Sequence, residues 1–89
     1  MQTYTVLLDY AGGTYVSQCT ATDAWQALRT WVSGLHENEA AGAISEEVAE
    51  AFDGEMGRPV HIQGLKNAWC ATASAKSGLA IANIIETVA

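Results

Sequence analysis

The chain has 89 residues, of which 49% are hydrophobic and 16% charged, so it is expected to fold as a single domain, residues 1–89, rather than to be disordered. Ten acidic residues oppose four basic ones, which gives a net charge of −6. Binding to nucleic acid or to an anionic membrane needs clustered lysine and arginine. The four bases of this chain are spread singly, so we expect neither kind of partner.

Three features of the sequence indicate a cytoplasmic protein. No apolar run reaches the ~18 residues that a membrane-spanning helix needs. The N-terminus has no basic region followed by an apolar stretch, so no secretion signal is expected. Cys19 and Cys70 are too few and too far apart for a disulfide framework, and we expect both to be reduced, buried and structural.

The chain opens with the pattern of a β-hairpin. Residues 3–9 are rich in β-branched and aromatic side chains, and residues 14–20 alternate in polarity. Between these runs lies the turn sequence Tyr10-Ala11-Gly12-Gly13. A Gly-Gly pair between two such runs is typical of a hairpin, because glycine tolerates the positive backbone angles of a tight turn.

An amphipathic helix is predicted next, over about 22–33. Thr22 is a good N-cap, with Thr20 and Asp23 as a rival capping arrangement, and Gly34 is a typical C-terminal stop. The apolar residues step by three and four and form one face, made of Ala24, Leu28, Trp31, Val32 and Leu35. We expect Leu28 and Trp31 to pack on a sheet. The alternative for the two tryptophans of this helix is an aromatic surface for a ligand.

The second half of the chain predicts a short helix and three strands. Ser45 can cap a helix over about 45–53 that Gly54 closes. Runs at 60–63, 68–73 and 79–88 follow, joined by short turns as in a β-meander. The last run also fits a helix, but its β-branched residues favour a strand.

The predicted element order is therefore β-β-α-(α)-β-β-β. This order indicates an α+β fold of two layers: a mostly antiparallel sheet with the main helix packed on one of its faces.

Acidic residues are concentrated in one segment, which holds seven acids and no base from Glu37 to Glu55. The simpler interpretation is a solvated helix and loop. The functional interpretation is a docking surface for a basic protein partner, with Glu46, Glu47 and Glu50 as candidate contacts. A calcium loop is not expected, because Asp53-Gly54-Glu55 lacks the alternating ligand spacing.

The sequence contains no recognisable catalytic, cofactor-binding or metal-binding pattern, and we expect no cofactor. His61 alternates with Val60 and Ile62, which is typical of a solvent-facing strand histidine, with a general base as the alternative. Cys70 lies beside Trp69, and the nearest base in sequence is Lys66. His61, Trp69 and Cys70 are thus the candidate surface for a ligand or for an enzymatic reaction.

The opening of the chain resembles that of HicB-like antitoxin domains. The residues that carry the resemblance are Tyr4-Thr5-Val6-Leu7-Leu8, Gly12-Gly13, Tyr15-Val16-Ser17-Gln18 and Asp23-Ala24-Trp25-Gln26-Ala27-Leu28. Those domains begin with a hairpin that has glycine at its turn, and their helix carries a Glu-Ala-Leu-like pattern, so the resemblance implies a β-β-α opening here. HicB proteins also carry a DNA-binding tail, which has no counterpart in this acidic sequence. As a whole the chain is similar to short uncharacterised bacterial proteins, a class that implies no function.

Self-association is the main functional prediction, and a symmetric homodimer is the expected form. Ile84 and Ile85 point to opposite faces of the last strand, so one layer of helices cannot cover both. As a terminal strand, 79–88 is also expected to form a sheet edge that invites pairing. We therefore expect a small acidic, non-catalytic interaction module. The alternative is a small-ligand-binding protein or enzyme with its site around His61, Trp69 and Cys70.

Overall fold

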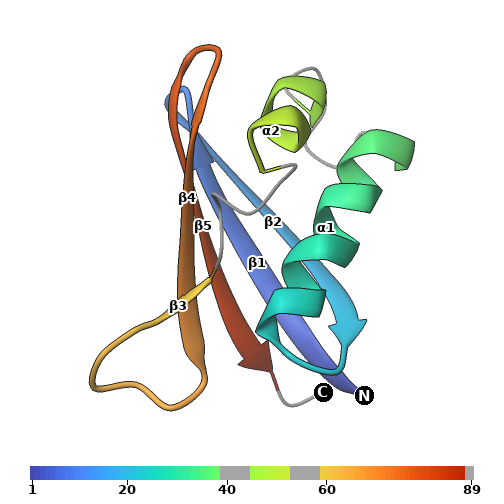
Figure 1. Cartoon of the computed structure of the whole chain (residues 1–89), viewed down its shortest axis with the longest axis vertical. Helices are drawn as coiled ribbons and strands as arrows, with labels where there is room; N and C mark the ends of the chain where they lie inside the picture. Colours follow the sequence, from blue (N-terminus) through green and yellow to red (C-terminus); the bar gives the residue numbers. More distant parts are fainter. Residues whose placement is uncertain (39–44, 53–58, 88–89) are drawn as a thin grey trace.

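The structure is a computed structural model, and it describes residues 1–38, 45–52 and 59–87. In these residues two strands come first, β1 (Gln2–Tyr10) and β2 (Gly13–Ala21), followed by two helices, α1 (Ala24–Asn38) and α2 (Ser45–Phe52). The strands β3 (Val60–His61), β4 (Ala68–Ala75) and β5 (Gly78–Thr87) complete the described fold (Figure 1).

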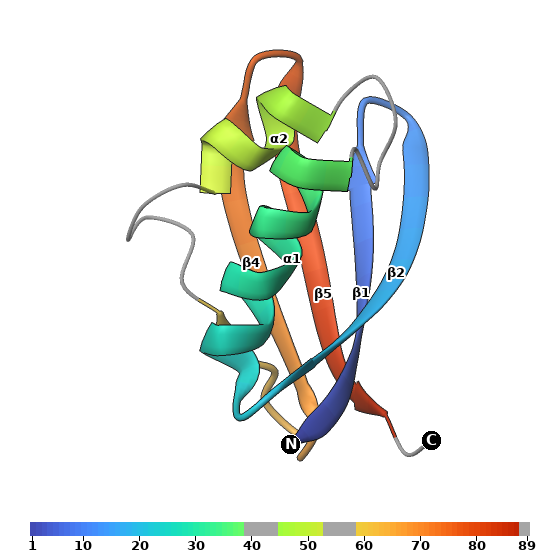
Figure 2. The same cartoon turned by 90° about the vertical axis from the view of Figure 1, so that its right-hand side faces the viewer.

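The five strands form one antiparallel sheet in the order β2-β1-β5-β4-β3. Both helices lie on the same side of this sheet (Figure 2), and α1 contacts β1, β2 and β5 while α2 contacts β4. The predicted α+β class is therefore confirmed as a five-stranded antiparallel sheet with two helices. The run at 79–88 forms a strand, as its β-branched residues favoured.

The predicted hairpin is confirmed, and its turn is tight. β1 and β2 pair without a break from Gln2 opposite Ala21 to Tyr10 opposite Gly13, which leaves only two residues in the loop. These two residues, Ala11 and Gly12, have positive φ angles of 50° and 81°. Positive angles at both central residues match the twist of the paired strands, so this two-residue loop closes the hairpin without splaying it.

The start of α1 differs from the prediction by one residue. Asp23 is the N-cap, because its Oδ1 accepts the backbone N–H of Gln26 at 2.8 Å. The side chain of Gln26 turns back in return, and its Oε1 accepts both the N–H and the hydroxyl of Thr22 at 2.6 and 2.9 Å. Thr22, the predicted cap, therefore lies just outside the helix and is bonded to it.

The predicted end of α1 at Gly34 is wrong, since the helix continues to Asn38. Leu35 explains the difference: it is the last residue of the predicted apolar face, it comes after Gly34, and its side chain is fully buried. The burial of a leucine is worth about 1.5–3 kcal/mol, which outweighs the roughly 1 kcal/mol that a glycine costs inside a helix. Tertiary packing thus overrides the stop signal.

Replacing Gly34 with alanine is expected to raise the free energy of unfolding by about 0.5–1 kcal/mol. A Cβ at this position would meet no atom within 4 Å, so the substitution adds helix propensity without a clash. A urea melt of the variant measures the change. If residue 34 ended the helix in a left-handed conformation, the same substitution would destabilise the protein, so the sign of the change separates the two cases.

The core lies between the sheet and the helices. The sheet residues that face the helices are buried, and those of β1 and β5 are Tyr4, Val6, Leu8, Tyr10, Ala80, Ala82 and Ile84. The predicted core positions Leu28 and Trp31 are confirmed, with 1% and 6% of their surfaces exposed. Trp31 also joins the two helices, because its ring meets that of Phe52 edge-on at 5.5 Å between centroids.

The prediction that 79–88 forms a sheet edge is wrong. β5 is the central strand, paired with β1 on one side and with β4 on the other. The N-terminal strand provides one of these partners, which local sequence patterns do not reveal. Ile84 faces the helices and is fully buried, whereas Ile85 faces the other side of the sheet and is 39% exposed, as their alternation predicted.

Candidate functional site

Trp69 is the centre of an aromatic cluster that lies beside β3. Its indole meets the ring of Tyr4 edge-on at 6.0 Å and that of His61 at 5.5 Å and a tilt of 51°. The register of β3 explains the second contact, because His61 lies directly opposite Trp69. His61 is exposed, and its Nε2 lies 2.9 Å from the carbonyl oxygen of Lys66. The structure therefore brings together two of the three residues of the candidate ligand surface.

Cys70, the third residue, lies on the opposite face of the sheet. It follows Trp69 in β4, and consecutive strand residues point to opposite faces. Trp69 contacts the core, whereas Cys70 is opposite Val60 and Asn83 in neighbouring strands. A thiol in this position cannot act on a ligand held by His61 and Trp69.

Both cysteines are free thiols, and both are half-buried rather than buried as expected, because each lies near an outer strand of the sheet. Cys19 belongs to β2, and its thiol donates a long hydrogen bond of 3.6 Å to the carbonyl oxygen of Ala27 in α1. Burial raises the pKa of Cys19, since a thiolate is poorly solvated there. A raised pKa lowers the thiolate fraction at neutral pH, so Cys19 has the character of a structural cysteine rather than of a nucleophile.

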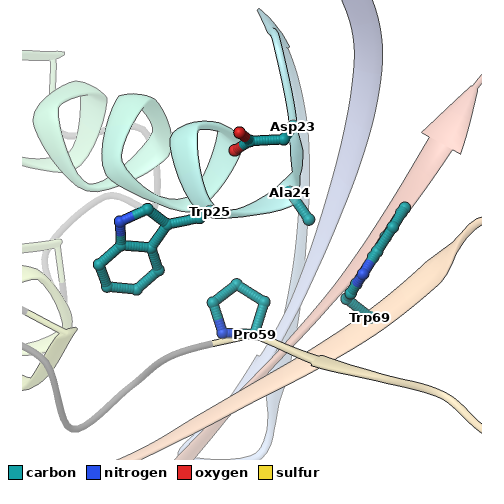
Figure 3. A pocket seen from close by; sticks show the side chains of 5 residues that line it. All are labelled: Asp23, Ala24, Trp25, Pro59 and Trp69. Atoms are coloured by element: carbon teal, nitrogen blue, oxygen red, sulfur yellow. The ribbon is translucent and has the colours of Figure 1, made fainter.

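A shallow hollow of about 250 Å³ lies between the start of α1 and the Trp69 cluster. It is lined by Asp23, Ala24, Trp25, Pro59 and Trp69 (Figure 3). The ring of Pro59 lies between the two indoles, and the carboxylate of Asp23 points toward the first turn of α1. The hollow is smaller than the roughly 300–1,000 Å³ of typical ligand pockets, so it can take only a small group.

Two chemical features limit what this hollow can bind. Asp23 is already engaged as the cap of α1, and the guanidinium of Arg29 lies over the ring of Trp25 at 5.8 Å. Nearby charge also acts on Tyr4, whose pKa is raised by burial, then by Glu86 and Asp23. The lining of the hollow is thus mainly apolar, and the described residues around it include no pair of groups arranged for acid–base catalysis.

Sequence patterns could not have identified this hollow as a unit. Pro59 and Trp69 belong to the second half of the chain, whereas Asp23 and Trp25 belong to the start of α1. The sequence marked Asp23 as a possible cap, and Trp25 and Trp69 as possible ligand contacts, but it did not indicate that the three lie together.

The acidic candidates Glu46, Glu47 and Glu50 lie on α2, with Glu46 and Glu47 in its first turn. Glu46 and Glu50 are exposed, and Glu47 is half-buried. Glu47 accepts a long hydrogen bond of 3.4 Å from the hydroxyl of Ser77, in the turn between β4 and β5. The predicted helix end at Gly54 and the acids of 53–55 lie outside the described residues.

The face of the sheet that points away from the helices has no covering layer in the described structure (Figure 1). It carries exposed apolar side chains from several strands, and the most exposed are Val16 (63%), Val60 (68%) and Leu79 (57%). Leu65 and Ile85 line a further hollow of about 330 Å³ together with Lys66, Asn67 and Ala68. We call this surface the open face.

Neither metal ligation nor a membrane span is indicated where the structure is described. Its His, Cys, Asp and Glu residues form no group of three or more that could hold a metal ion. None of its helices is both long and apolar enough to cross a membrane. Both findings concern residues 1–38, 45–52 and 59–87 only.

Comparisons with known proteins give no relative: no family model, no curated protein and no solved structure matches the chain. The resemblance of the opening residues to HicB-like domains therefore stays a prediction.

Proposed function

We propose that this protein is a non-catalytic interaction module of the cytoplasm that forms a symmetric homodimer through the free edge of β2. The observation that carries the proposal is the nature of this edge. β2 is an outer strand of nine residues, paired with β1 on one side only among the described residues. Two free thiols agree with a reducing compartment.

β2 lacks the features that prevent exposed edge strands from pairing with further strands. Natural edge strands are commonly short, bulged, or protected by lysine or proline. The sequence of β2 is Gly-Thr-Tyr-Val-Ser-Gln-Cys-Thr-Ala, which contains no charged residue and no proline. Its register with β1 is continuous, so it contains no bulge either. An edge of this kind is open to a further strand.

The hairpin geometry identifies the backbone groups that remain available. The two-residue turn closes on Tyr10 and Gly13, which therefore form a hydrogen-bonded pair. In an antiparallel ladder such pairs alternate with pairs whose N–H and C=O groups point outward. The outward groups of β2 belong to Thr14, Val16, Gln18 and Thr20, all of which have exposed side chains.

A second copy of the chain suits this edge for electrostatic reasons. Each chain carries a net charge of −6, so two copies repel each other overall. β2 itself has no charge, and an antiparallel pair of β2 strands satisfies the two-fold symmetry of most dimers. The pairing would join two five-stranded sheets into one.

Sedimentation equilibrium at micromolar concentration tests the proposal, and we expect the mass of two chains. Val16→Lys is expected to give a single chain, because it places two like charges across the symmetry axis and weakens the strand. Gln18→Pro is expected to do the same, because it removes an outward N–H while leaving the ladder with β1 intact. Circular dichroism checks that both variants remain folded.

Leu79→Lys is the matched control. It makes the same change of charge at an exposed apolar residue of the open face, away from β2. A dimer that survives Leu79→Lys but not Val16→Lys uses the edge of β2. A single-chain mass for the unaltered protein at every concentration, or a dimer indifferent to both Val16→Lys and Gln18→Pro, would overturn the proposal.

A further inference from the structure

The opposite edge of the sheet is also incompletely paired. β3 has only two residues, and it pairs with Trp69 and Cys70 near the start of β4. The remaining part of β4, from Ala71 to Ala75, has no neighbouring strand on that side among the described residues. We call this part the β4 edge.

The backbone of the β4 edge points outward at Thr72 and Ser74. The N–H of Ile62 donates to the carbonyl oxygen of Ala68 at 2.9 Å, so Ala68 faces the β3 side. Alternate residues of a strand direct their backbone groups to the same side, which places Thr72 and Ser74 on that side too. Neither has a backbone partner there within the described chain.

Two adjoining hollows follow the β4 edge. One, of about 420 Å³, is lined by Ala51, Thr72, Ala73, Ser74 and Leu79. The other, of about 210 Å³, is lined by Glu47, Glu50, Ala51, Ser74, Ala75 and Lys76. Ala51 and Ser74 line both, so the two hollows adjoin each other between α2 and β4, and we call them together the groove.

The groove has two chemically different sides. Glu47 and Glu50 of α2 line its helix side, where Lys76 is the only base among the lining residues. Leu79 and Thr72 lie on the side of the groove toward the open face. In the sheet, Leu79 is opposite Ser74 and Thr72 is opposite Ile81. A strand that paired with the β4 edge would turn alternate side chains toward these two sides.

We propose that the β4 edge binds an extended basic segment of another protein, which adds to the sheet as a further strand. Its backbone pairs with Thr72 and Ser74. Its lysine or arginine side chains point to Glu47 and Glu50, and its alternate apolar side chains lie against Leu79. This site is separate from the proposed dimer edge, which is at the far side of the sheet.

Charge decides which occupant suits the groove. The strand edges that a second copy of this chain would offer are β2, which has no basic residue, and its own β4 edge, which lies beside the same two acids. Neither complements Glu47 and Glu50. A basic segment is attracted by both carboxylates. Its backbone also forms hydrogen bonds with the β4 edge, in place of those that each makes with water.

Fluorescence anisotropy with a labelled peptide of alternating lysine and valine, about eight residues long, tests the proposal on the whole chain. We expect saturable binding that weakens as salt is added, because exposed charge pairs are screened. A peptide of alternating glutamate and valine tests the role of charge. Lysine–valine peptides that are N-methylated at every lysine or at every valine test the role of backbone pairing. The glutamate peptide and at least one N-methylated peptide should fail to bind.

A pair of double variants localises the effect of charge. Glu47→Gln with Glu50→Gln should raise the Kd of the lysine–valine peptide about two- to fivefold for each acid. Asp9→Asn with Glu86→Gln removes the same two charges from residues that do not line the groove, and should leave the Kd within about twofold of the unaltered protein.

The position of binding is read from backbone amide shifts in two-dimensional NMR spectra. Peptide-induced changes at Thr72 and Ser74, with the amides of Val16 and Gln18 unmoved, would support the proposal. It would be overturned by absence of binding, by equal binding of all N-methylated peptides, or by changes confined to β2. It would also be overturned if the two double variants behaved alike.

Discussion

Leu28→Ala is expected to lower the free energy of unfolding by about 2–5 kcal/mol. Leu28 lies on the buried stripe of α1, and only 1% of its surface is exposed. Its removal would leave a cavity between the helix and the sheet that neighbouring side chains fill only in part. For a domain of this size the loss is a large fraction of the total stability.

A urea melt followed by circular dichroism measures this change. Arg29→Ala is a suitable control, because Arg29 is the next residue of α1 but is exposed to solvent. Its replacement should change the free energy of unfolding by less than about 1 kcal/mol, which allows for its contact with Trp25. A loss below about 0.5 kcal/mol for Leu28→Ala would contradict the assignment of the buried face of α1.

The elements that could be predicted from the sequence are those with strong local signals. The hairpin has alternating strands around a glycine turn, and α1 has an apolar stripe at helical spacing, so both were located closely. The end of α1 was not, because the stop signal at Gly34 is local while the burial of Leu35 depends on α2 and the sheet. Tertiary contacts therefore determine where α1 ends.

Strand order could not be predicted for a related reason. Nothing in the sequence of β5 indicates whether one or two strands flank it, and its position at the C-terminus suggested an edge. In the structure β1 pairs with β5, so the first strand of the chain lies beside the last. The functional consequence is large, because the free edges belong to β2 and β4 instead.

The candidate site was predictable only in part. The alternation of strand residues correctly separated Ile84 from Ile85, and the same rule places Cys70 away from Trp69. The contact of His61 with Trp69 depends on the register of β3, and the groove beside the acids of α2 depends on where β3 begins. Neither leaves a signal in the sequence.

The two neighbouring isoleucines of β5 provide a matched pair for the largest expected effect. Ile84→Glu would place a carboxylate in the core, opposite Val6 in β1 and Trp69 in β4. A buried charge without a partner costs several kcal/mol, so we expect this variant to be largely unfolded at neutral pH. Ile85→Glu makes the same chemical change on the open face, where the side chain reaches water, and we expect it to remain folded.

Circular dichroism at neutral and at mildly acidic pH distinguishes the cause of the effect in Ile84→Glu. Burial would raise the pKa of the new carboxyl group above its value in the unfolded chain. The native state then binds more protons than the unfolded state, so stability should be partly regained as the pH falls. Ile85→Glu should show no such recovery. Equal stability of the two variants would contradict the assignment of the two faces of β5. A dimer lost in Ile85→Glu alone would assign self-association to the open face rather than to the edge of β2.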